Sequence, residues 1–320
     1  MKIVESEQPP PTAGPAVVAG AGLRGEFKHL RTPISNGAFA AKLAVCALLI
    51  AAGAALALYP AGWSRTVGVL LLGCMFAHAA ELQHQALHSL GFRNRRANMV
   101  AGIALGVPML ISFAAYRATH LRHHRDLGTP ENREFFDYGD QYGADGTRSR
   151  WRTVLVWTIR FTMLHFYRLF LENAGRALLG RDYPDESAAT SRRIRRDHYV
   201  ILAVLLVLTV LSVLVREPVV LWVWVLPLLL VAGPVHAAIE LPEHFRCETL
   251  NQDPFANTRT IRSNRFMMWF TNGNNFHVEH HLMPNLPIER LPDLHAEVRP
   301  RLKYFHTSYL SFFTKLVRGR

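Results

Sequence analysis

The chain has 320 residues, half of them hydrophobic, and its long apolar runs are separated by short basic stretches, which excludes an ordinary water-soluble domain and indicates several membrane spans. The formal net charge of +12 comes from Lys and Arg residues clustered beside these runs, so it argues for membrane orientation and against a nucleic-acid partner. With three cysteines, two of them inside apolar runs, neither a disulfide framework nor a cysteine-based metal site is indicated.

Residues 1–38 are predicted to be a flexible Pro/Gly-rich tail without a cleavable signal peptide. Residues 39–320 are expected to form a single membrane domain. Its first two apolar runs, at about 39–60 and 66–82, are near the length of about 20 residues that crosses the hydrocarbon layer. A very short loop joins them, which predicts a transmembrane hairpin.

The middle of the chain is less apolar. Residues 98–116 contain glycine and proline and are expected to form a re-entrant or shallow helix, whereas 151–175 have the pattern of an amphipathic helix lying in the membrane interface. Two strong spans, about 199–215 and 218–239, then form a second hairpin. The predicted fold class is an all-α integral membrane protein with four transmembrane helices as two hairpins, interfacial or re-entrant helices, and a cytoplasmic helical cap.

Basic residues set the predicted orientation. They precede the first span, follow the second and precede the third, whereas Arg65 and Arg216 mark a sparsely charged opposite side. Residues 84–125 and 240–281 are therefore expected on the cytoplasmic side, in a multi-pass protein of the bacterial inner membrane.

Histidines gather in these two cytoplasmic stretches. Nine of the sixteen fall in four groups: His84 and His88; His120, His123 and His124; His244; His277, His280 and His281. On a helix, residues three or four positions apart share one face, so His84 with His88, and His120 with His123 and His124, can each present imidazoles to a common point.

A single interfacial histidine more often caps a helix end or extends its ring to the membrane surface. We prefer that interpretation for six others: His29, His78, His165, His198, His295 and His306. For His236, two turns before His244 on the same face, the structural and metal-binding interpretations are evenly balanced. The nine together are better explained as metal ligands. Nine imidazoles exceed one zinc site, imidazole also suits iron, and two metal ions with open positions are the economical interpretation.

The spacing HxxxH after the second span, HxxHH some thirty residues later and HxxHH after the fourth span resembles the three histidine boxes of membrane fatty acid desaturases and related hydroxylases. The residues after the last box, from His281 to Leu291, look like that family's HHLxPxxPxxxL tail. His244 lies where many bacterial members carry an additional ligand. The HxxxH spacing differs from stearoyl-type acyl-CoA desaturases, which points toward the acyl-lipid and bacterial groups.

The resemblance implies that all nine histidines bind two non-haem iron ions, with O2 as co-substrate and a membrane lipid as substrate. Acidic and amide neighbours are candidate partners for the second ring nitrogens of the ligands. These candidates are Glu279, Asp126, Glu240, Asn272 and Asn275. No fused electron-transfer domain is recognised, so we expect a separate donor of the ferredoxin or cytochrome b5 type with its reductase.

The expected reaction is O2-dependent desaturation of a fatty acyl chain. Hydroxylation or ketolation of a fatty acid, alkane, sphingolipid or carotenoid would use the same ligands, so that alternative stays open. A membrane metal transporter is the remote alternative. It predicts ionisable residues along a path through the spans, but residues 199–235 have only Arg216 and Glu217, both in the connecting loop.

Overall fold

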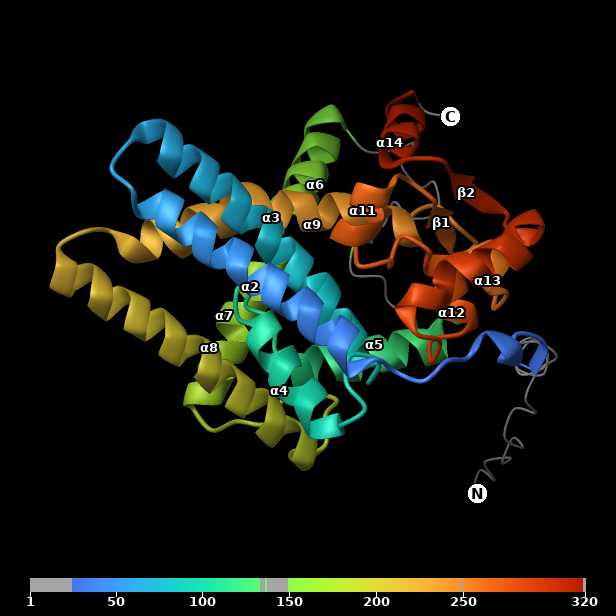
Figure 1. Ribbon diagram of the computed structural model, residues 1–320, viewed down its shortest axis with the longest axis horizontal. Coiled ribbons are helices and arrows are strands. Elements are labelled where there is room, and N and C mark those ends of the chain that lie inside the picture. The colour runs from blue at the N-terminus through green and yellow to red at the C-terminus, as the bar shows by residue number, and fades with distance from the viewer. Residues whose placement is uncertain (1–24, 133–135, 137–148, 249, 319–320) are drawn as a thin grey trace, which may run out of the picture.

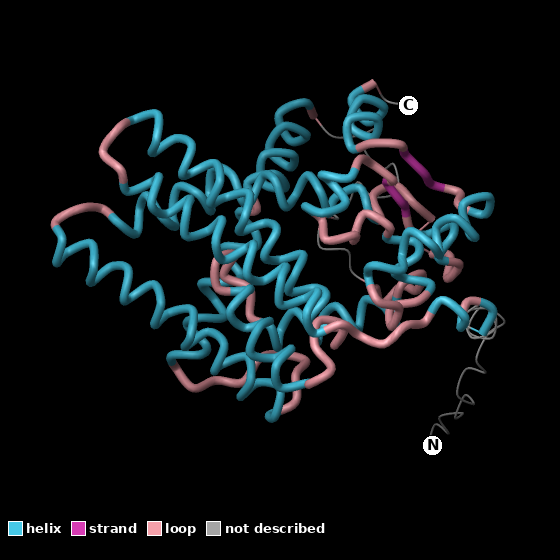
Figure 2. The backbone as a smooth tube through the Cα atoms, in the orientation of Figure 1, coloured by secondary structure: helices cyan, strands magenta, loops and turns pink. Residues whose placement is uncertain are grey.

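The computed structural model describes residues 25–132, 136, 149–248 and 250–318, and the expected all-helical fold is confirmed. Figures 1 and 2 show long helices on one side and short helices with two small strands on the other. Four helices are long and apolar enough to cross a membrane. They are α2 (Asn36–Leu58), α3 (Gly62–Leu87), α8 (Ala188–Val215) and the segment Leu221–Glu243.

Small residues allow α2 and α3 to approach closely. A Cβ added at Gly68 would lie 2.2 Å from the backbone nitrogen of Ala57, and one added at Gly73 would lie 2.3 Å from the Cβ of Val231 in the fourth span. Glycine at these two positions therefore brings α3 against both neighbours. This packing fixes α3, the helix whose last turn carries His84.

The fourth span is irregular. It consists of two π-helical segments, η3 (Leu221–Val225) and η4 (Pro227–Ala232), then α9 (Gly233–Glu240) and a final 3-10 turn, η5 (Leu241–Glu243). Prolines at 227, 234 and 242 lack the N–H group that a regular α-helix needs. These breaks determine how the end of the span presents His244.

By contrast, α8 faces outward over most of its length. Leu206, Val213 and Leu214 are 64%, 71% and 72% exposed. An apolar helix with such side chains uncovered fits contact with lipid. One face of its amino-terminal half is buried instead, and there Asp197 accepts hydrogen bonds from the backbone N–H of Ala114 and the hydroxyl of Ser112.

Residues 98–116 do not form one helix. They comprise most of α4 (Arg95–Gly106), a turn, and the start of α5 (Phe113–Asp126), which begins at the cap residue Ser112. Pro108 lies in the turn, where it has no backbone N–H with which to continue the hydrogen bonding of α4. The turn separates a short packing helix from the helix that carries the second histidine box.

The predicted amphipathic segment is also divided. It forms α6 (Arg150–Thr162) and α7 (Leu164–Leu178), which meet at an angle of 56° where Met163 adopts a left-handed conformation. Taken together, the two helices are also long and apolar enough to cross a membrane, so the bent pair is either a broken span or a re-entrant element.

A cap of short elements follows the fourth span. It contains α10 (Pro254–Asn257), α11 (Arg265–Phe270), α12 (His277–Leu282), η6 (Ile288–Arg290), α13 (Leu291–Val298), η7 (Arg299–Arg301) and α14 (Tyr309–Val317). Strands β1 (Arg259–Ile261) and β2 (Tyr304–His306) pair in parallel, with Arg259 opposite Tyr304.

The start of the described chain joins this cap. The turn η1 (Lys28–Leu30) buries Phe27 and Leu30 in a core that also contains Leu286 and Leu291. Of the predicted tail, residues 1–24 lie outside the described residues, so its flexibility stays a prediction. The segment immediately before the first span is packed against the cap.

Candidate metal centre

Five histidines converge where α3, α5 and α12 meet. The Nε2 atom of His120 lies 2.8 Å from that of His84 and 2.9 Å from those of His88 and His124. His280 joins through an Nε2 distance of 2.9 Å to His124. We call this set the five-histidine group, and its five donor atoms all lie within 4.8 Å of one another.

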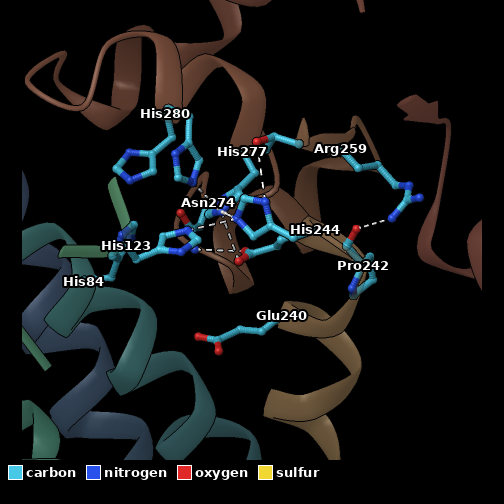
Figure 3. Close-up of polar contacts among 12 residues, drawn as sticks. His84, His123, Glu240, Pro242, His244, Arg259, Asn274, His277 and His280 are labelled. Atoms are coloured by element: carbon cyan, nitrogen blue, oxygen red, sulfur yellow. Dashed lines mark hydrogen bonds and ion pairs between the residues drawn. The ribbon is translucent and has the colours of Figure 1, made fainter. Parts of the chain in front are cut away.

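Four further histidines form a second set, the four-histidine group, whose donor atoms meet the same 4.8 Å limit. The Nε2 atom of His244 lies 3.1 Å from those of His123 and His277, and His281 lies 3.1 Å from His277. Figure 3 shows His123, His244 and His277 pointing toward one another.

Consecutive histidines belong to different groups. His123 and His124 are neighbours on α5, and His280 and His281 are neighbours on α12, yet each pair divides between the two sets. Adjacent helical residues point about 100° apart, so an HH pair can serve two points at once. The rings of His124 and His281 lie 4.3 Å apart between centroids, which places the two groups side by side.

Burial keeps these imidazoles neutral. It is the largest cause that lowers the pKa of His120, His277 and His280 well below the usual range. Burial, aided by the nearby Arg117, lowers the pKa of His88 to about 3. A neutral imidazole is the form that binds a metal ion, so the sites are set for coordination at physiological pH.

The second nitrogens of two rings are held by the protein. His244 Nδ1 lies 3.1 Å from the carbonyl oxygen of Asn257, and His123 Nδ1 lies 3.1 Å from Oδ1 of Asn132. A hydrogen bond at Nδ1 fixes the tautomer and leaves Nε2 as the donor to a metal.

Two of the predicted acidic partners contact residues other than the nine histidines. Glu279 is fully buried, accepts a 2.6 Å hydrogen bond from the hydroxyl of Thr260, and lies 2.6 Å from Nδ1 of His295. It therefore joins α12 to β1 and α13. Asp126 pairs with the adjacent Arg125 at 2.6 Å, and that hydrogen bond lowers its pKa.

The amide candidates also bind structural neighbours. Asn272 contacts Lys42 and Gln85, which ties α2 and α3 to the cap. Asn275 donates to the carbonyl oxygen of Ile261 and so supports β1. Glu240 lies 3.3 Å from Nε2 of His236 rather than beside one of the nine.

Two residues that the sequence analysis missed reach the four-histidine group. Oε2 of Glu243 lies 3.2 Å from Nε2 of His277, and Nδ2 of Asn274 donates to the other carboxylate oxygen at 3.2 Å. Glu243 directly precedes His244 in the sequence, and this adjacency to a predicted ligand could have identified Glu243 as a candidate. Asn274 precedes His277 by three residues, but only the tertiary fold brings it to Glu243.

Several of the remaining histidines contact backbone or acidic groups, but the expected role at a helix end or the membrane surface is wrong for His78 and His198, which are buried within α3 and α8. His78 contacts the carbonyl oxygen of Phe270 at 2.7 Å, and His198 contacts that of Ile194 at 2.9 Å. His29 pairs with Glu297 at 2.8 Å.

The spacing of the donors tests whether metal ions fit. With metal–nitrogen bonds of about 2.1 Å, neighbouring donors lie about 3.0 Å apart at right angles and about 3.4 Å apart in a tetrahedron. The observed Nε2 distances of 2.8–3.1 Å match the right-angled arrangement. Imidazole nitrogens that face a shared point at these distances are explained by an ion between them. Both groups can hold a metal.

These features define an integral membrane protein with a histidine-rich centre that can hold metal ions at one end of its spans. The family model for fatty acid desaturases matches residues 61–313, which run from the start of α3 into α14 and include three of the four spans and all nine histidines. The chain therefore belongs to the fatty acid desaturase family. None of the curated proteins compared with it matches the chain.

Proposed function

We propose that this protein is an O2-dependent fatty acyl desaturase whose nine histidines bind two iron ions. The observation that carries the proposal is the convergence of the nine imidazoles in two adjacent groups at the end of the spans. Imidazole-rich donor sets whose spacing suits right angles favour six-coordinate iron over tetrahedral zinc. When bound, the irons supply the activation of dioxygen for attack on an unactivated C–H bond.

The residues of the chain hold and orient this centre. The five-histidine group would bind one ion and the four-histidine group the other, with Glu243 adding a carboxylate oxygen beside His277. Asn257 and Asn132 fix the ring orientation of His244 and His123. A membrane lipid would bring its hydrocarbon chain from the span side, and whether the product is an alkene or an alcohol depends on placement within about an ångström.

The orientation and the partner are also proposed. The arginine-rich start of α8 precedes the third span on the side of the histidine centre, which supports a cytoplasmic location in a bacterial inner membrane. Exposed cations surround the cap. They include Arg262, Arg265, Arg299, Arg301 and Lys303. This surface suits an acidic ferredoxin or cytochrome b5 type donor, which a reductase would supply with electrons.

Two measurements test the proposal. The purified protein is expected to hold two irons per chain, and zinc in their place would contradict the di-iron assignment. Mass spectrometry of lipids from a host expressing the protein should show a loss of two hydrogens, whereas a gain of one oxygen would assign the hydroxylase alternative.

A further measurement tests the proposed electron donor. If the positive surface of the cap steers an acidic donor, turnover falls as ionic strength rises, and a rate indifferent to salt would exclude such steering.

A further inference from the structure

A third group of polar side chains converges beside the histidine centre. It consists of Glu81 on α3 and of His236 and Glu240 on α9, with one donor atom of each within 4.8 Å of the others. His236 lies between the two acids. Its Nε2 is 3.3 Å from Oε1 of Glu240 and its Nδ1 is 3.9 Å from Oε1 of Glu81.

The contacts within this group leave a polar atom unsatisfied. His236 is 5% exposed and Glu81 is 2% exposed, yet Nδ1 of His236 has no hydrogen-bond partner among the described residues. A separation of 3.9 Å is too long for a hydrogen bond. Buried polar atoms are nearly always paired, so an orphan aimed at a buried carboxylate needs a ligand to explain it.

The group is distinct from the nine histidines. Glu81 precedes His84 by three residues and Glu240 precedes His244 by four, so each lies about one helical turn toward the spans. Figure 3 shows Glu240 below the contacts that join His123, His244 and His277, with its carboxylate apart from them.

Charge identifies the class of ligand. Two ionised carboxylates beside a neutral imidazole would carry a charge of −2, which is costly to bury unless a cation balances it. Mixed oxygen and nitrogen donors of this kind suit a divalent transition-metal ion such as zinc, manganese or ferrous iron.

We propose that Glu81, His236 and Glu240 bind a third divalent transition-metal ion, separate from the two histidine groups. The ion joins α3 to the irregular fourth span one turn below the histidine centre. This site does not depend on which reaction the histidine centre performs.

The test is the metal content of purified protein that is stripped by a chelator, refilled with Zn²⁺ alone and freed of excess metal. Wild-type protein should retain three equivalents, one for each converging group. Glu81→Gln and His236→Gln should each retain two. Glu217→Gln makes the same chemical change at an exposed loop acid and should retain three.

Other outcomes overturn the site. Two equivalents in the wild type, or three in both site variants, would contradict it. An infrared band of a protonated carboxylic acid that disappears in Glu81→Gln would show protons in place of the ion. If Glu81→Gln folds poorly, Glu81→Asp keeps the carboxylate, and its third equivalent should be bound more weakly than in the wild type.

A failure of the third site is distinguishable from a failure of the di-iron proposal. His280→Ala removes a donor from the five-histidine group and leaves Glu81, His236 and Glu240 intact. It should therefore lose an equivalent that Glu81→Gln retains, and the double variant should lose both.

Discussion

The five-histidine and four-histidine groups are built differently. The first uses regular helical spacing, with His84 in the last turn of α3, His88 just beyond it and His120 with His124 on α5. The second depends on irregular backbone, because His244 follows a 3-10 turn and relies on the carbonyl oxygen of Asn257. Both groups contain a pair four residues apart on a regular helix, since His277 and His281 lie on α12, and both take a ligand from the cap; only the second adds a ligand from irregular backbone, His244.

Removing one ligand from each group gives the largest expected effect. His120→Ala takes away the ring that contacts three others in the five-histidine group, and His277→Ala is its counterpart in the four-histidine group. Each variant should lose activity to below detection and lose one histidine-bound metal equivalent, measured by elemental analysis. Loss of both equivalents from either variant would show that the groups fill as one unit.

Glu279→Ala should destabilise the cap by about 3–5 kcal/mol, because it leaves Thr260 and His295 without their buried partner. The measurement is the shift in thermal unfolding of the metal-free protein in detergent. Glu297→Ala, at an exposed acid, is the control. Equal unfolding temperatures for the two variants would refute the structural role of Glu279.

Glu243→Gln is expected to weaken metal binding by roughly 10–100-fold at the four-histidine group only, since the carboxylate contacts His277. Competition with a chelator measures the affinity of each equivalent. Glu248→Gln, nearby but paired with Lys303 on the surface, should bind as the wild type does. An equal loss at both groups would remove the distinction between them.

Asp197→Ala has the smallest expected effect, about 1–2 kcal/mol of stability, because the Asp197 carboxylate caps the start of α5. The change should increase the mobility of α5, which carries His120 and His124, and so affect the five-histidine group first. Hydrogen exchange of the α5 amides measures it. Unchanged exchange in α5 would show that α8 does not position the box.

The sequence was sufficient for the parts of the fold that follow from local chemistry. Apolar length predicted all four spans, and helical spacing predicted that His120 and His124 face a common point, but it wrongly added His123 to them. The division of His123 from His124 required the relative placement of three helices. The partners of Glu279 could not be predicted because His295 lies sixteen residues away, on a helix that contacts α12 only in the folded cap.

The contrast between local signals and contacts made only by the tertiary fold also explains why the sequence analysis overlooked some acids. Glu81 lies within an apolar span, where its neighbours in sequence give no reason to connect it with His236. The bend at Met163 is similar, because a left-handed residue in an otherwise periodic segment carries no local signal such as glycine or proline.

The packing of Phe27 and Leu30 against the cap has a consequence for biosynthesis. The residues that complete the histidine groups, on α12, emerge from the ribosome only after all four spans, and the cap then closes on a segment made before the first span. If the histidine groups bind metal as proposed, the ions enter only after the spans have been made. A fusion partner placed within residues 27–30 would then interfere with closure of the cap over the histidine groups.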